Sequence, residues 1–223
     1  ARVGNRKTGR KYKRYELKTA SELRRSFKHR KWRLVNGLTP GSGTMPESVP
    51  IVRARKRTQP TTRIIEQIPI EQFMKLAGWY LSEGCCRLDG LHNGEIAICQ
   101  SATANPSFRR EIIALLEKIG FSPNTKRIQI TINNVDLAHC LVGHFGLGSY
   151  SKRIPRWVKD LDPGLLVILR DTMMKGDGNK NGFAYASVSP QLRDDFQEIC
   201  VLTGWRTAIS GNVVRIGQKQ VFP

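Results

Sequence analysis

Two carboxylates occupy matching places in the sequence, and their positions suggest metal chemistry. Glu83 ends one apolar segment and stands before Gly84, and Asp177 ends another and stands before Gly178. A glycine at that point commonly stops a helix. Each acid is therefore expected at the negative end of a helix dipole, where a carboxylate is unfavourable unless a cation neutralises it. As a pair the acids favour Mg²⁺, which prefers hard oxygen ligands; taken singly, either acid could pair with a nearby Arg or Lys.

The elements that would hold these acids are predicted to occur twice in the same order. Hydrophobic periodicity and turn residues predict helices at 70–83, 106–119, 135–145, 163–176 and 190–203, and strands at 86–89, 95–101, 127–132, 183–188, 206–210 and 213–216. Glu83 and Asp177 are 94 positions apart, and the second helix of each set runs from a proline to a glycine 14 positions later. Arg109 and Arg193 each follow that proline by three residues. Two helix–strand–strand–helix–strand–strand repeats describe this pattern better than one irregular domain.

The basic charge is concentrated at the N-terminus. The formal net charge is +19, and residues 1–66 hold 19 Lys and Arg residues against 4 Asp and Glu residues. Such a surface attracts a polyanion, and the aromatic residues among these charges make a simple charged tail a poor description. Nucleic acid is the predicted partner, with a solubility tail or a membrane-surface patch as the alternatives.

Other compositional features limit the class of protein. No apolar run approaches the roughly 20 residues that span a membrane, and no apolar segment follows the basic N-terminus as in a signal peptide. We therefore expect no membrane association and a location inside the cell, cytoplasmic or organellar. The five cysteines form no CxxC pair, which argues against a zinc site and a disulfide framework.

The nine residues 76–84, Leu-Ala-Gly-Trp-Tyr-Leu-Ser-Glu-Gly, resemble the LAGLIDADG motif of homing endonucleases. A second, weaker copy has Thr172 at the inner glycine and Lys175 at the first acidic position, but it keeps Gly-Asp-Gly at 176–178. The resemblance covers roughly residues 69–220. It implies an α+β fold of two pseudo-symmetric αββαββ(α) repeats that form a DNA-binding saddle, preceded by a basic extension.

The implied domains are the extension at 1–68, the first repeat at 69–153 and the second repeat at 154–223. The second repeat lacks a counterpart of the helix at 135–145, so we expect a truncated chain or one that ends an element early. The two motif helices are expected to pack closely through Ala77, Gly78 and Thr172.

The resemblance also implies an activity. It predicts a monomeric, site-specific endonuclease that cuts double-stranded DNA at a long asymmetric target by two-metal hydrolysis, with Mg²⁺ as cofactor and Ca²⁺ as a non-cleaving substitute. Glu83 and Asp177 would be catalytic and would hold metal, with the carbonyls of Gly84 and Gly178 as further ligands. The residues expected to position water and polarise the phosphate are Lys180 and Gln100, with Lys219 as a further candidate and Arg87 or Lys126 on the first-repeat side. A solvated loop lysine is the alternative for Lys180.

The predicted DNA contacts lie in the extension and on the exposed faces of the strands. In the extension, a helix at 20–30 opened by the capping box at 19–22 and an extended segment at 51–57 would supply Arg24, Arg25, Lys28, Arg30, Lys31, Arg53, Arg55 and Arg57. A flexible arm at 1–11, a strand at 13–18 and a loop at 36–50 are expected around them. The strands and their loops would supply Arg87, Lys126, Arg127, Gln129, Thr131, Asn133, Asn181, Tyr185, Arg206, Arg215, Gln218 and Lys219, with Asp89, Glu95 and Lys180 as further candidates. A solvated strand face is the alternative for any one of them.

Two other functions remain open from the sequence. An RNA maturase or a DNA-binding regulator without cleavage could use the same fold, although the intact pair of acids argues against a loss of cleavage. A generic basic structural protein is disfavoured by the duplicated motif.

Overall fold

The computed structural model describes residues 2–5, 16–17, 32–35, 45–54 and 65–219. The chain divides into two compact units, Ala1–Thr39 and Pro40–Pro223. The first unit contains a three-stranded antiparallel sheet in the order β2-β1-β3, formed by β1 (Arg2–Asn5), β2 (Glu16–Leu17) and β3 (Trp32–Val35). The predicted strand at 13–18 is confirmed at Glu16–Leu17. The flexible arm expected at 1–11 is wrong for Arg2–Asn5, because this segment pairs with β3. The predicted helix at 20–30 lies outside the described residues.

The second unit contains the elements predicted from periodicity. Its helices are α2 (Ile70–Glu83), α3 (Pro106–Ile119), α4 (Val135–Phe145), α5 (Arg156–Lys159), α6 (Pro163–Asp177) and α7 (Pro190–Leu202). Its strands are β4 (Ser48–Pro50), β5 (Gln67–Pro69), β6 (Gly84–Asp89), β7 (Asn93–Cys99), β8 (Asn124–Thr125), β9 (Gln129–Asn133), β10 (Ala184–Ala186), β11 (Trp205–Ser210) and β12 (Val213–Lys219). The five long helices are confirmed, and the strands predicted at 86–89 with 95–101 and at 206–210 with 213–216 form the antiparallel pairs β6–β7 and β11–β12. The short elements β4, β5, β8 and α5 were not predicted, because two to four residues carry no periodicity.

The segment around β4 corrects one prediction about the N-terminal region. β4 pairs with β5, so the loop expected at 36–50 is wrong at its end. Residues 51–54 follow β4 without forming a strand. Val49 and Ile68 are buried in the core of the second unit, so this segment packs with the elements that follow it.

The helix ends follow from local sequence. Asp162, Ser189 and Asn134 are the N-caps of α6, α7 and α4, and their side chains accept hydrogen bonds from backbone N–H groups of the first turn. Gly120 ends α3 with φ of 107°, a left-handed conformation that glycine adopts without steric cost. These local signals explain why the helix positions could be predicted without tertiary information.

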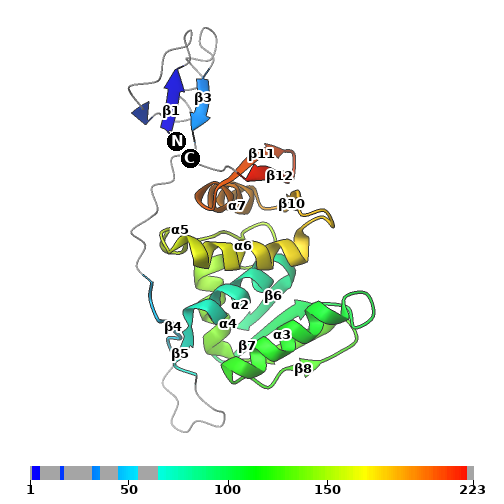
Figure 1. Ribbon diagram of the computed structural model, residues 1–223. Coiled ribbons are helices and arrows are strands. Elements are labelled where there is room, and N and C mark those ends of the chain that lie inside the picture. The colour runs from blue at the N-terminus through cyan, green and yellow to red at the C-terminus, as the bar shows by residue number, and fades with distance from the viewer. Residues whose placement is uncertain (1, 6–15, 18–31, 36–44, 55–64, 220–223) are drawn as a thin grey trace. The chain divides into compact units, whose positions relative to one another are not determined.

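The helices α2 and α6 cross at the centre of the second unit in very close contact (Figure 1). A Cβ atom added to Gly78 would lie 2.6 Å from Cβ of Thr172, and one added to Gly176 would clash with the Ser82 side chain. Because both glycines have no side chain, the two backbones approach closely all the way to their C-terminal ends. Those ends carry Glu83 and Asp177.

The strand order of the second sheet matches that of the last three strands of the first sheet. The first sheet has the order β6-β7-β9-β8, and the second has the order β10-β12-β11. Gly84 pairs with Ile98 in β7, and Gly178 forms an isolated bridge with Tyr185 in β10. Gly178 therefore takes the place of β6 in the second half, and Tyr185 takes the place of Ile98.

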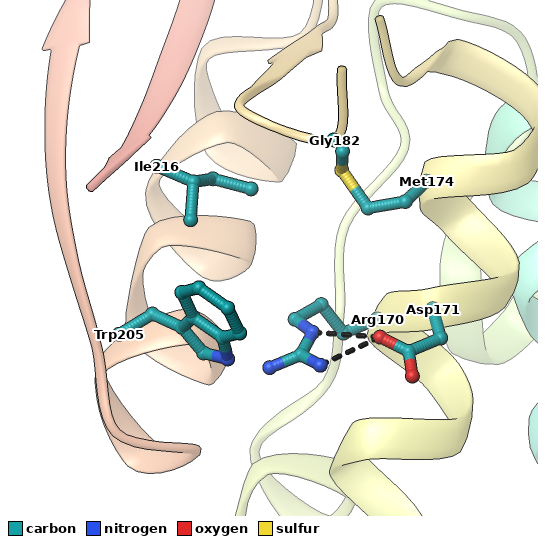
Figure 2. Close-up of a pocket in the computed structure, with 6 residues that line it drawn as sticks. All are labelled: Arg170, Asp171, Met174, Gly182, Trp205 and Ile216. Atoms are coloured by element: carbon teal, nitrogen blue, oxygen red, sulfur yellow. Dashed lines mark hydrogen bonds and ion pairs between the residues drawn. The ribbon is translucent and has the colours of Figure 1, made fainter. Parts of the chain in front are cut away.

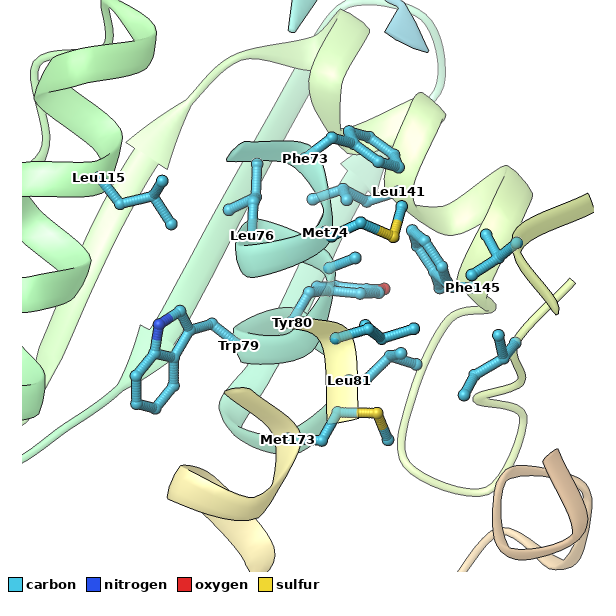
Figure 3. Packing of buried hydrophobic residues seen from close by; sticks show 14 of the residues in the cluster. Phe73, Met74, Leu76, Trp79, Tyr80, Leu81, Leu115, Leu141, Phe145 and Met173 are labelled. Carbon is cyan, nitrogen blue, oxygen red and sulfur yellow. The ribbon is translucent and has the colours of Figure 1, made fainter. Parts of the chain in front are cut away.

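The core is built around α2 (Figure 3). Trp79 extends toward α3, where its ring lies 5.8 Å from that of Phe108, and Phe73 packs against Phe145 of α4. Leu81 lies next to Met173 of α6. A helix buried on nearly every side holds its C-terminal residue rigidly. None of the described helices is long and apolar enough to cross a membrane.

Candidate metal centre and DNA interface

The convergence of α2 and α6 places Glu83 and Asp177 beside each other. Desolvation raises the pKa of Asp177 to about 6, and repulsion from Glu83 is the second cause. The residue nevertheless remains exposed to solvent. Burial raises the pKa of Glu83 as well. Both carboxylates are thus destabilised in their charged form, as expected for two like charges held together at helix C-termini.

Gln100 links the first acid to the loop after β7. Its amide Nε2 donates to Oε1 of Glu83 at 3.1 Å, and its Oε1 accepts from Nδ2 of Asn105 at 3.1 Å. Arg109 donates to the backbone carbonyl of Gln100 at 2.8 Å. The side chain of Gln100 is therefore oriented at both ends and lies against Glu83. Its predicted role, to position water and polarise the phosphate, stays a prediction.

Lys152 is a site residue that the sequence analysis missed. It is only 6 % exposed, and its Nζ donates to the carbonyl of Gly84 at 2.9 Å. Burial lowers the pKa of Lys152, and the charges of Asp177 and Glu83 oppose that shift. The sequence contains no local signal for this role, because Lys152 lies 69 positions after Glu83 in the connection between the halves.

The backbone around Lys152 holds it in place. Its carbonyl accepts a hydrogen bond from Oγ of Ser189 at 2.7 Å, and the N–H of Ile154 donates to Oδ2 of Asp195 at 2.7 Å. Both partners belong to the cap and first turns of α7. The connection between the halves is therefore anchored on the second half while its lysine reaches the first motif.

The residues at the helix ends fit a divalent metal ion of the magnesium type. Their donors are hard carboxylate oxygens whose mutual repulsion a cation would relieve. Within the described residues, no three or more His, Cys, Asp or Glu side chains gather into a metal site. Two protein carboxylates suit Mg²⁺, because this ion keeps several waters and commonly binds substrate phosphates as well.

The other predicted site residues lie at different distances from this centre. The Gly84 carbonyl accepts from Lys152, so a metal ion would share it with an ammonium group. Gly178 follows Asp177 directly and pairs with Tyr185. Lys180 is exposed in the loop before β10, and Lys219 ends β12. The metal-binding role of both glycines and the catalytic role of both lysines stay predictions.

Most predicted base contacts of the first half lie on one face of its sheet. The register places Arg87 of β6 opposite Glu95 of β7, and Glu95 opposite Asn133 of β9. Gln129 is on the same face, opposite Cys99. The other face carries Ile96, Ile98, Ile130 and Ile132, which are buried. Lys126 and Arg127 are exposed in the loop before β9.

Two predicted contacts on the strands are wrong as direct base readers. Tyr185 is completely buried, and its ring stacks on Phe196 with centroids 4.0 Å apart. It was mistaken for an exposed residue because the strand register was unknown. Thr131 is on the polar face of the first sheet but is only 7 % exposed, and its hydroxyl donates to the carbonyl of Asn124.

The remaining candidates are distributed over three places. Arg206, Arg215 and Asn181 are exposed on the second sheet and its preceding loop. Arg53 is exposed after β4 and forms an ion pair with Glu66 at 3.3 Å. The extension residues Arg24, Arg25, Lys28, Arg30, Lys31, Arg55 and Arg57 lie outside the described residues, as do the side chains of Gln218 and Lys219.

A separate pocket lies between α6 and the second sheet (Figure 2). The guanidinium of Arg170 stands 5.2 Å from the centre of the Trp205 ring and pairs with Asp171. Met174, Gly182 and Ile216 complete its lining. The pocket contains none of the residues that the sequence analysis selected.

Comparison with known proteins identifies the fold. The sequence matches no protein-family model and no curated protein at a significant level. A solved structure of I-DmoI in complex with DNA and Mn is similar, with a TM-score of 0.51 and 9% sequence identity over 66% of this chain and 90% of that chain. Two I-DmoI variants with target DNA, one with Mn and one with Mg, each score 0.49 at 8% and 9% identity, over 66% of this chain and 87% and 89% of theirs.

The second unit therefore has the LAGLIDADG fold of I-DmoI. The α+β class expected from the motif is confirmed. At this level of sequence identity the likeness establishes the fold alone, and the activity is argued from the site.

Proposed function

We propose that this chain is a LAGLIDADG homing endonuclease, a monomeric enzyme that cuts both strands of DNA at a specific, long and asymmetric target. The observation that carries the proposal is the meeting of Glu83 and Asp177 at the ends of two crossing helices, with Lys152 beside them. The solved structures of I-DmoI with DNA and Mn or Mg support DNA as the partner and a divalent metal ion as the cofactor.

The residues of the site would have the following roles. Glu83 and Asp177 would hold the metal ions, with the carbonyls of Gly84 and Gly178 as further ligands. Bound there, Mg²⁺ would supply the two-metal chemistry of phosphodiester hydrolysis, activating water and stabilising the leaving oxygen. Gln100 would orient the Glu83 carboxylate through the hydrogen bond that joins them. Lys152 would offer a positive charge to the scissile phosphate.

The surfaces around the site would bind the DNA. The polar face of the first sheet and the arginines of the second would follow the grooves and the phosphates. The N-terminal extension, predicted at residues 1–68, would lengthen the phosphate footprint and make binding more salt-dependent. The two repeats, predicted at 69–153 and 154–223, would form the saddle that covers the target.

The test is cleavage of the DNA that the gene interrupts. The full chain is incubated with Mg²⁺ and a duplex that joins the two flanks of its gene, and we expect cuts in both strands with short 3′ overhangs. Ca²⁺ should support binding without cleavage. Tight binding to an intron RNA without Mg²⁺, together with no cut DNA, would favour the maturase instead.

A further inference from the structure

The outward faces of the two sheets carry different side chains. In the first half, the cross-strand register aligns Arg87, Glu95 and Asn133 in one row across β6, β7 and β9. Gln129 lies farther along the same face, where its amide reaches Sγ of Cys99 at 3.9 Å. We call Arg87, Glu95, Gln129 and Asn133 the first-half face. All four side chains are polar, and none of the four is buried. The same face also carries the small residues Cys85, Ala97, Cys99 and Thr131 between them.

The corresponding face of the second half carries mostly small side chains, with two arginines among them. Its central row consists of Ala184, Arg215 and Ala208 across β10, β12 and β11. The next row consists of Ala186, Val213 and Ser210. Within the described side chains of these three strands, Arg206 and Arg215 are the long polar ones on this face, which we call the second-half face.

Base recognition depends on side chains that can form hydrogen bonds, so the difference between the two faces should affect how each contacts DNA. In the major groove, arginine makes paired hydrogen bonds to guanine, asparagine and glutamine make them to adenine, and glutamate accepts from cytosine. Alanine has no hydrogen-bonding group, and its methyl can contact only a thymine methyl. An isolated arginine serves a phosphate as readily as a base.

The geometry of the first-half face suits adjacent base pairs. Neighbouring strands are about 4.8 Å apart, so a row across three strands spans about 10 Å. Base pairs rise by about 3.4 Å, so this row covers about three of them. Arg87 and Asn133 are exposed at the two ends of the row, with the half-buried Glu95 between them.

We propose that the first-half face reads the base sequence of one half of the DNA target, while the second-half face holds the other half through its phosphates with little choice of base. This inference rests on the proposed function, because it assumes a double-stranded DNA target. The exposed loop residues Lys180 and Asn181 extend beyond the second sheet, so the contrast concerns the sheet faces.

The test measures base preference on each side of the target. The full chain in Ca²⁺ selects duplexes from a randomised library, and each base pair of the best duplex is then changed in turn. We expect single changes in one half to weaken binding about tenfold or more, and changes in the other half by less than about threefold. Equal sensitivity in the two halves would overturn the inference.

Two matched variants show which sheet contacts which half of the DNA target. Arg87→Ala should abolish the preference at about one position of the sensitive half. Arg215→Ala should weaken binding to all sequences by a similar factor and reduce its salt dependence. If Arg87→Ala instead weakens all sequences alike, or Arg215→Ala relaxes a base preference, the assignment of the faces is wrong.

A cleavage assay run in parallel distinguishes failure of this inference from failure of the proposed endonuclease function. Cleavage of the selected duplex in Mg²⁺ together with equal sensitivity of both halves would leave the endonuclease standing and remove only the inference. A chain that selects no duplex would overturn both.

Discussion

The two halves of the second unit share a scaffold but differ in the polar groups around their acids. Glu83 receives a hydrogen bond from Gln100, and Lys152 binds the carbonyl of the next residue. In the second half, the strand register that pairs Gly178 with Tyr185 places Ser187 where the first half has Gln100. Ser187 does not reach the acid; its hydroxyl accepts a hydrogen bond from the N–H of Ser189.

The shared scaffold shows which parts of the repeat are structural. Arg109 donates to the carbonyls of Gln100 and Lys126, and so ties α3 to the end of β7 and to the loop before β9. Arg193 donates to the carbonyl of Ser187 and to Asn212, and so ties α7 to the equivalent strand end and turn. The arginine kept in both halves thus fixes the fold, whereas Gln100 and Lys152, which have no counterpart in the second half, would act in the first half alone. Five experiments can test this difference between the two halves.

The largest effect is expected for the two acids, which both halves contribute. Glu83→Gln and Asp177→Asn should each reduce cleavage by about 10³-fold or more, because either change removes a metal ligand. Binding in Ca²⁺ should persist. The control is Asp171→Asn, an acid on the same helix that pairs with Arg170. Full cleavage by Glu83→Gln or by Asp177→Asn would show that the acid at that helix end is not needed for cleavage.

Lys152 should distinguish the two DNA strands. Lys152→Met is expected to slow the cut nearest the first motif about 10²-fold, because a charge placed by the fold is lost from that side. A duplex labelled on each strand would then accumulate a nick. Lys180→Met should slow the opposite cut, because Lys180 is the lysine predicted to assist cleavage in the second half, and the exposed Lys118→Met on α3 serves as the control. An equal slowing of both strands would show that Lys152 serves both halves.

Gly78 tests the close helix contact that both motifs require. Gly78→Ala should destabilise the fold by about 1–3 kcal/mol, because its Cβ would lie 2.6 Å from Cβ of Thr172. Thr172→Gly should restore part of that loss in the double variant. Urea unfolding measures both. Gly90→Ala is the contrasting variant: its φ of 53° makes it strained, but no atom lies within 4 Å of the added Cβ. Additive losses for Gly78 and Thr172 would contradict the contact.

The raised pKa of Asp177 predicts a pH-dependent stability of the metal-free protein. Since its pKa in the folded protein is about 6, above the ordinary 3.8, the folded state binds the proton more tightly than the unfolded state. The wild type should therefore lose stability as pH rises through 6. Asp177→Asn should melt higher than wild type at pH 7.5, by no more than about 2 °C because Asp177 is exposed and water screens its charge, and this advantage should vanish near pH 4. A pH-independent difference between the two proteins would contradict this account.

The smallest effect is expected for Tyr185. Its hydroxyl is buried without a hydrogen-bond partner among the described residues. Tyr185→Phe should therefore leave stability unchanged or increase it by about 1 kcal/mol, and DNA binding should not change. Thermal melting and DNA binding check the two parts. A loss of base preference would show that Tyr185 contacts DNA and does not have the buried position that Ile98 has in the first half.

The sequence by itself determined the parts of this protein that depend on neighbouring residues. The long helices have apolar faces and recognisable ends, so periodicity and capping located them closely. The two acids could be paired because each stands before a glycine at the end of a repeated pattern. The short strands β4, β5 and β8 could not be predicted, because pairing with another strand stabilises them and their own two or three residues show no periodicity.

Only the tertiary structure decided which side chains meet. Strand alternation cannot say which face is buried until the partner elements are placed, so Tyr185 and Thr131 were misjudged while Arg87 and Asn133 proved exposed. Lys152 reaches the first motif from 69 positions away, and no local pattern encodes a contact of that length. Secondary structure is specified over a few residues, but a site is assembled by packing, and packing brings together residues that the sequence keeps apart.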